Sequence, residues 1–160
     1  MATPTQEIRK FVKDLEGVFK DITSKRQLLF LGNEAIKVIK DRTRRGRGVA
    51  KPGGRSTKLK ALSKAYIEQR KRIRLSPFTN ARKSNLTRSG RMLASLRSTV
   101  QGNKVVVKPT GQSREGVPNE KVAEHVTDQG RPFLNLSADE TQRLLKQFRI
   151  ALERGLKRLD

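Results

Sequence analysis

The chain contains no cysteine and no tryptophan, and it has one tyrosine and a single histidine, His125. Without cysteine there is no disulfide, no thiolate nucleophile and no cysteine-ligated zinc site. A single histidine also excludes a metal site built from several histidines. Hydrophobic residues make up 34% of the 160 residues, so we expect a small core that is filled mainly by aliphatic side chains.

Long apolar runs are missing as well. The first 17 residues, MATPTQEIRKFVKDLEG, are charged and amphipathic, and they hold no apolar run long enough for a signal peptide or a membrane span. We therefore expect a soluble protein that is made in a cytoplasm and does not insert into a membrane.

Acidic residues are scarce in the middle of the chain. Residues 42–114 contain 21 lysines and arginines but one acid, Glu68, whereas the remainder is close to neutral. The formal net charge of the whole chain is +22. A field of this strength favours a polyanionic partner, with nucleic acid first and an anionic membrane or an acidic protein next.

Two amphipathic helices are expected before the basic region. The first covers residues 8–22, where one apolar stripe recurs at helical spacing. The stripe consists of Ile8, Phe11, Val12, Leu15, Val18, Phe19 and Ile22. Ser24 can cap a second helix over residues 25–41, and the short connection suggests an antiparallel pair. We expect the stripe of this first helix, and the apolar stripe of the last helix of the chain, to lie in the core.

Residues 42–60, RTRRGRGVAKPGGRSTKLK, hold eight basic residues, four glycines and no acid. This composition predicts a loop or arm rather than a packed element. The cations expected to touch DNA phosphates are Arg42, Arg44, Arg45, Arg47, Lys51 and Arg55. Such contacts give an affinity that depends on salt and not on base sequence. The alternative is a solvated loop without a ligand. A weaker helix is predicted over residues 57–72.

A β-hairpin is predicted over residues 93–108. One strand covers residues 93–100, with Leu96, Ser98 and Val100 on one side. Residues 101–103 make the turn, and residues 104–108 return. A lone hairpin is marginally stable in water, so it must pack on helices or join another chain's sheet. A short helix over residues 120–130 follows.

The stretch RPFLNLSADE, residues 131–140, combines an apolar turn with a helix start. Ser137 and Glu140 have the spacing of a capping box, which predicts a C-terminal helix from this point onward. Phe133, Leu134 and Leu136 are expected either to lie in the core or to contact another subunit. The full set of predicted structural or interface residues is Leu93, Leu96, Val106, Arg131, Pro132, Phe133, Leu134, Leu136 and Ser137.

Catalytic chemistry has little support. His125 stands alone, and the glycine-rich stretch GRGVAKPGG lacks the Gly-Lys-Ser/Thr ending of a phosphate-binding loop. No cluster of acids could hold Mg²⁺, which argues against a nuclease. We expect no catalytic residue, no metal and no cofactor, and therefore a protein that is not an enzyme.

Residues 85–148 resemble the phage virion morphogenesis and tail-completion family, which sits at the head–tail junction of tailed bacteriophages. The order and spacing of three short motifs carry the resemblance. The first is matched by Leu86, Ser89, Gly90 and Leu93, and the second, in part, by Val122, Ala123, His125 and Gly130. The third is matched by Arg131, Pro132, Phe133, Leu134, Leu136, Ser137 and Asp139.

The resemblance implies a homo-oligomeric ring, usually of six copies, around the axis through which the genome passes. Adjacent neck, connector or tail proteins would be its partners, together with DNA bound without sequence specificity. Its place would be the virion, after assembly in the host cytoplasm. The alternative, favoured by composition, is a small basic nucleic-acid-binding protein of a ribosomal or nucleoid-associated kind.

The sequence predicts an α+β fold in a single domain, residues 1–160. Amphipathic N- and C-terminal helices would pack against a small antiparallel β-sheet, with a long basic loop or arm. Residues 1–41 would form the helical pair and residues 42–60 the arm. Residues 61–160 would form an α+β body that ends in the C-terminal helix.

Overall fold

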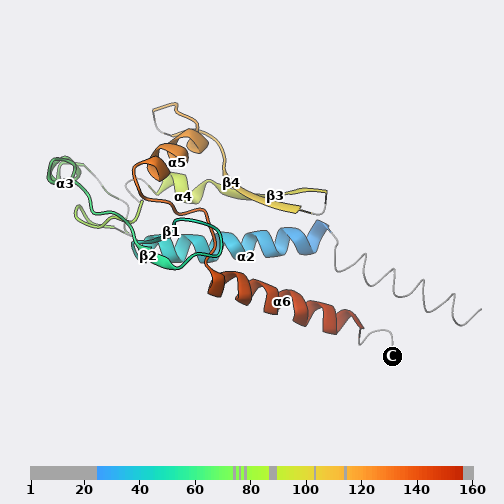
Figure 1. Ribbon diagram of the computed structural model, residues 1–160. Helices are drawn as coiled ribbons and strands as arrows, with labels where there is room; N and C mark the ends of the chain where they lie inside the picture. Colours follow the sequence, from blue (N-terminus) through green and yellow to red (C-terminus); the bar gives the residue numbers. More distant parts are fainter. Residues whose placement is uncertain are drawn as a thin grey trace, which may run out of the picture.

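The computed structural model describes residues 25–73, 75, 77, 79–86, 90–102, 104–113 and 115–156, and only the backbone of residues 151, 152, 155 and 156. Several predicted features lie outside these residues. They are the helix over residues 8–22 and its pairing with the next helix, the helix cap Ser24, the motif residue Ser89 and the turn residue Asn103. The elements in chain order are α2 (Lys25–Arg44), β1 (Arg47–Val49), β2 (Ser56–Lys58), α3 (Lys64–Lys71), α4 (Arg91–Ala94), β3 (Leu96–Gln101), β4 (Lys104–Pro109), α5 (Asn119–Asp128) and α6 (Ala138–Leu156). The fold is α+β, as predicted (Figure 1).

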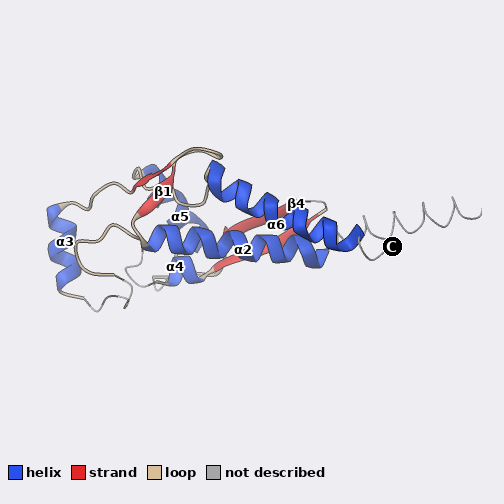
Figure 2. Ribbon diagram, turned by 90° about the horizontal axis from the view of Figure 1, so that it is seen from below, coloured by secondary structure: helices blue, strands red, loops and turns tan. Residues whose placement is uncertain are grey.

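Helix α2 is the central element. The hairpin β3–β4 lies along one side of it, and α6 starts beside its C-terminal end and runs along the other side (Figures 1 and 2). The buried face of α2 includes Gly32, where an added Cβ would lie 2.6 Å from Ser98 Cβ and 2.6 Å from Val105 Cγ2. The absence of a side chain at this position therefore allows α2 and the hairpin to approach closely.

The predicted hairpin is confirmed, but its first strand begins later than expected. β3 pairs with β4 in antiparallel register, with Leu96 opposite Pro109 and Val100 opposite Val105. Leu93 lies instead in α4, a single helical turn that follows Gly90, whose φ is +73°. The left-handed glycine turns the chain, and both Met92 and Leu93 then face the core. A short apolar run does not distinguish a buried helical turn from a strand.

Residues 42–60 are not the unpacked arm that their composition predicts. α2 continues through Arg44, and β1 and β2 then form a short antiparallel hairpin. The base of this β1–β2 hairpin is closed by Leu59 N, which donates to Gly46 O (2.8 Å), and the loop between its strands is anchored to the C-terminal part of the chain by Gly53 N, which donates to Leu136 O (2.9 Å). Val49 is fully buried. Leu59 is buried as well, so apolar burial and backbone hydrogen bonds together hold the hairpin against the body.

The helix predicted over residues 57–72 is shorter than expected. Thr57 and Lys58 belong to β2, and α3 begins at Lys64 after the cap Ser63, whose Oγ accepts from Tyr66 N (3.3 Å). Pairing of Thr57 with Gly48 explains why the first part of the predicted helix is extended. Both views place α3 at one end of the molecule, away from α6 (Figures 1 and 2).

One hydrophobic cluster joins five parts of the chain. It takes Ile36 and Ile39 from α2, and it also contains Met92, Leu93, Leu96, Ala123 and Phe133. Phe133 has no exposed surface, and Leu134 and Leu136 pack against the cluster. Of the two alternatives for Phe133, the structure therefore selects the core of its own chain.

The helix start in RPFLNLSADE is confirmed. Glu140 N donates to Ser137 Oγ (3.3 Å), and Ser137 N donates to Glu140 Oε2 (2.8 Å), which is the reciprocal pair of a capping box. The short helix before it is also confirmed as α5. The apolar stripe of α6 is not plain core, however, since Leu145, one of its predicted members, is 61% exposed. Among the described side chains of α6, Glu140 at its start is buried, and Leu144 and Phe148 are half-buried.

Replacing Gly48 by alanine is expected to lower the free energy of unfolding by about 1–3 kcal/mol. An added Cβ would lie 2.0 Å from Pro132 O and 2.6 Å from Leu59 Cδ2, and a backbone oxygen cannot move aside as a flexible side chain can. Urea denaturation followed by circular dichroism measures the change. Thr57→Ala is the control, because Thr57 pairs with Gly48 and is exposed. Equal stability of the two variants would show that the hairpin does not need this close approach.

Candidate nucleic-acid interface

Arg42, predicted to face DNA, is instead buried. It lies in α2, with 7% of its surface exposed. Its guanidinium donates one hydrogen bond to Glu140 Oε2, with which it forms an ion pair, and another to Phe133 O. A guanidinium in the interior requires such partners, and here they come from the start of α6 and the apolar turn. Arg42 therefore joins α2 to the C-terminal part of the chain and is not available to a phosphate.

Two opposing effects act on the Arg42 guanidinium. Burial lowers its pKa, and the charge of Glu140 together with their hydrogen bond raises it. Arginine remains protonated under ordinary conditions, so the pair is ionic. The same carboxylate oxygen of Glu140 accepts from Ser137 N, so the capping box and the ion pair share one atom.

Three of the predicted DNA-facing residues lie on the β1–β2 hairpin, and all three are exposed. They are Arg47, Lys51 and Arg55. Arg47 is braced within the hairpin, since its Nε donates to Ser56 Oγ (3.1 Å) and its Nη2 to Ser56 O. The tip is further held by Asn135, whose Nδ2 donates to Val49 O (3.2 Å) and Ala50 O (3.1 Å). These cations therefore stand on a supported element and not on a freely moving arm.

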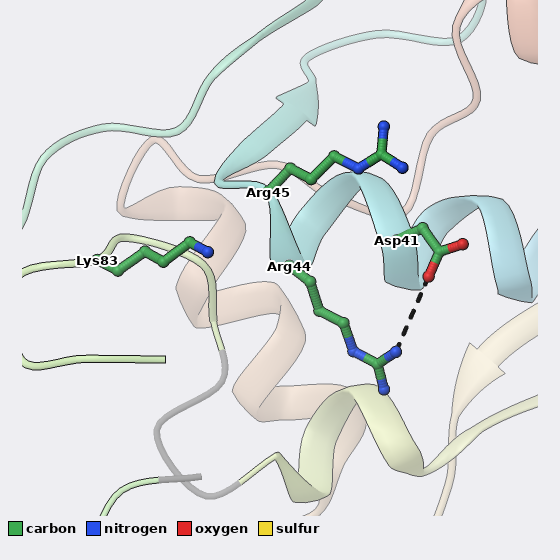
Figure 3. Close-up of a pocket in the computed structure, with 4 residues that line it drawn as sticks. All are labelled: Asp41, Arg44, Arg45 and Lys83. Atoms are coloured by element: carbon green, nitrogen blue, oxygen red, sulfur yellow. Dashed lines mark ion pairs between the residues drawn. The ribbon is translucent and has the colours of Figure 1, made fainter. Parts of the chain in front are cut away.

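Arg44 and Arg45 line an open hollow of about 360 Å³ together with Asp41 and Lys83 (Figure 3). Arg44 lies 3.8 Å from Asp41, and Arg45 is exposed. Lys83 approaches from the loop over residues 79–86. That loop is held by Arg70, which donates to Lys83 O (3.1 Å), Asn80 O (3.1 Å) and Thr79 Oγ1 (3.0 Å).

Sequence reasoning did not select Lys83. It stands about 40 residues after Arg44, and nothing in its local pattern distinguishes it from other lysines. Its contribution depends on the folding of the 79–86 loop against the end of α2, where Asn85 Nδ2 donates to Arg44 O (3.3 Å). The one available signal was its place within the acid-poor region.

The predicted structural residues of the third motif lie together around the start of α6. Arg131 Nε donates to Lys60 O (3.1 Å) and its Nη2 to Ala61 O (3.0 Å), which ties this turn to the chain after β2. Pro132 is half-buried against Gly48, and Ser137 is buried in the cap. Val106 is half-buried in β4, opposite Thr99. Whether any of them contacts another subunit stays a prediction.

A second hollow of about 360 Å³ lies between the β1–β2 hairpin and the end of α5. Its lining is Gly48, Ala50, Thr57, Lys58, Leu59, Thr127, Gly130 and Pro132. These are mostly apolar or backbone groups, without a nucleophile and base in contact. His125 is exposed on α5, and the residues that the structure describes contain no group of three or more metal-ligating side chains.

No helix within the described ranges is long and apolar enough to cross a membrane. Comparison with family models, curated proteins and solved structures gave no match to the chain.

Proposed function

We propose that the protein is a structural component of the head–tail junction of a tailed bacteriophage. It would form a ring, with six copies as the expected number, around the passage of the DNA, and it would join the head connector to the tail. The resemblance of residues 85–148 to the tail-completion family is the observation that carries this proposal. The proposed location is the virion, with neck or tail proteins as the proposed neighbours.

The charge distribution supports the same proposal. Residues 42–114 hold 21 basic residues and one acid, and exposed cations stand on the β1–β2 hairpin and at the end of α2. Residues 42–60 contain no aromatic side chain on which bases could stack. Attraction to the backbone without reading of the bases is what a channel for passing DNA requires.

The hairpin β3–β4 offers a means of assembly. In the described part of the chain it is a two-stranded sheet, and its outer edges have no further strand. An unpaired edge can accept a strand from a neighbouring copy, and head-to-tail contacts of this kind close into rings. A strand from a neighbouring copy would enlarge this two-stranded sheet, which is small for a domain of this length.

The full-length protein is expected to assemble into a closed ring when its concentration is raised, and to be a component of purified virions. Native mass spectrometry across the micromolar range measures the number of copies, and negative-stain electron microscopy shows whether the ring is closed. A protein that stays monomeric at micromolar concentration and is also absent from virions contradicts the proposal.

The second candidate is a small nucleic-acid-binding protein without a place in a particle, and the net charge of +22 favours it. It predicts that the monomer binds DNA or RNA tightly, with a steep dependence on salt. Tight binding by a monomer that never assembles would select this candidate over the neck ring.

A further inference from the structure

Five cations gather near the C-terminal end of α2, and we call them the α2 cation cluster. Lys40 and Arg44 belong to α2, Arg45 follows it, Lys83 comes from the loop over residues 79–86, and Arg97 comes from β3. The fold thus brings together side chains from three separate segments. Only two of the five, Arg44 and Arg45, were predicted from the sequence to face DNA.

The cluster has two parts that share Arg44. In the first part, Arg44, Arg45 and Lys83 surround the open hollow (Figure 3). In the second part, Lys40 is half-buried in the last turns of α2, four residues before Arg44, and Arg97 lies on β3, which packs against α2. Burial lowers the pKa of Lys40, and the positive charges of Arg97 and Arg44 lower it further, so these cations are close enough to repel one another.

Asp41 is the one carboxylate in the lining of this hollow, and it lies 3.8 Å from Arg44. Several other described cations have acids of their own, because Lys37 pairs with Glu34, Lys71 with Glu68 and Lys108 with Glu120. Three cations, Arg44, Arg45 and Lys83, line the hollow beside this one carboxylate, and an anion bound among them would relieve the repulsion between their charges.

The helix dipole offers a simpler account of part of the cluster. Cations are favoured in the last turn of a helix, which is sufficient reason for Arg44 and Arg45 to stand there without a ligand. It does not account for Lys83 or Arg97, which come from other segments. Arg97 is held in place by donating to Ala94 O (2.9 Å) and Leu96 O (3.0 Å).

We infer that the α2 cation cluster binds phosphate groups of a nucleic-acid backbone, with Arg44, Arg45 and Lys83 around the hollow and Arg97 on the adjacent strand β3. Planar guanidinium groups suit phosphate oxygens, and the open hollow admits an extended backbone without a deep pocket. The mounting of these side chains on α2, β3 and a braced loop gives a site with a defined position. This inference depends on the proposed function in one respect, since that function makes DNA the expected source of the phosphate groups.

The test compares two triple variants of the full-length protein that remove equal charge. The cluster variant is Arg45→Gln, Lys83→Gln and Arg97→Gln. The control variant is Arg26→Gln, Lys121→Gln and Arg143→Gln, which neutralises exposed cations on α2's first turn, α5 and α6. Arg44 is left unchanged because its ion pair with Asp41 would also be broken. Circular dichroism and urea denaturation check that both variants fold.

Fluorescence anisotropy with a duplex DNA of mixed sequence measures the affinity between about 50 and 200 mM salt. Each lost phosphate contact reduces the slope of log affinity against log salt by about 0.9. We expect the cluster variant to lose about 2–3 from this slope and the control variant less than about 1. Equal losses in the two variants would overturn the inference, because they would reflect net charge alone. So would binding of the wild-type protein to anionic phospholipid vesicles but not to DNA.

Ring assembly is measured separately on the same variants by native mass spectrometry. If the protein assembles normally but both variants lose the same slope, the phosphate-binding role of the cluster is wrong and the proposed neck ring is unaffected. A protein that never assembles, but in which only the cluster variant loses slope, supports the site and contradicts the ring.

Discussion

Replacing Arg42 by alanine is expected to lower the free energy of unfolding by about 3–5 kcal/mol, because breaking a buried ion pair leaves an uncompensated charge in the interior. The alanine would leave the buried Glu140 carboxylate with the hydrogen bond from Ser137 N but without its cationic partner, and it would remove the donor to Phe133 O. Urea denaturation monitored by circular dichroism measures the loss. The affinity for DNA at fixed salt should change little, since Arg42 is not exposed.

The control replaces both partners at once. Arg42→Met with Glu140→Leu removes the two charges and fills their space with apolar side chains, so the stability lost to the unpaired charge should return, whereas the capping hydrogen bond from Ser137 N stays lost. The coupling energy of the pair is the change in unfolding free energy of the double variant minus the sum of the changes for Arg42→Met alone and Glu140→Leu alone. A loss below about 1 kcal/mol for Arg42→Ala alone would show that water solvates Glu140 after the change and that the pair is not truly interior.

Replacing Phe133 by alanine is expected to lower the free energy of unfolding by about 3–5 kcal/mol, the range for a large aromatic side chain removed from a packed core. Phe133 has no exposed surface and joins α2, α4, β3 and α5 in one cluster. The loss should therefore be present in the monomer, before any assembly. The salt dependence of DNA binding by the folded fraction should be unchanged, because no cation moves.

Leu145→Ala is the matched control for Phe133→Ala. Leu145 lies a short distance further along the chain, in α6, but is 61% exposed, so its loss should change stability by less than about 0.5 kcal/mol. If Phe133→Ala unfolds at the same urea concentration as Leu145→Ala, Phe133 is not the anchor of the turn. If Leu145→Ala leaves folding intact but reduces the number of copies per ring, the exposed stripe of α6 lies in a subunit contact.

The elements that were predicted correctly depend on residues close together in the chain. The turn between β3 and β4 and the alternation of Leu96, Ser98 and Val100 are local signals, and so is the spacing of Ser137 and Glu140. Helix α5 and the start of α2 follow from local periodicity in the same way. In each case the interacting groups lie within a few residues of one another.

The errors share one physical cause. Residues 42–60 look like a solvated arm because they are basic and glycine-rich, yet backbone bonds to Gly46 and Leu136 and the burial of Val49 make them a supported hairpin. In the sequence Arg42 resembles its exposed neighbours, but in the fold it forms an ion pair with the carboxylate of Glu140, 98 residues further along the chain. The apolar stripe of α6 looks like core, but nothing described in this chain covers Leu145.

The sequence by itself determined the α+β composition, the absence of cysteine chemistry, the concentration of positive charge in residues 42–114 and the helix start at Ser137. These follow from composition and from contacts within one or two turns of chain. Only the tertiary structure decided which arginine is buried and which are exposed, and that Lys83 and Arg97 stand beside the end of α2. A guanidinium has the same chemistry in either place, and its role depends on whether distant segments bring it a carboxylate or leave it facing solvent.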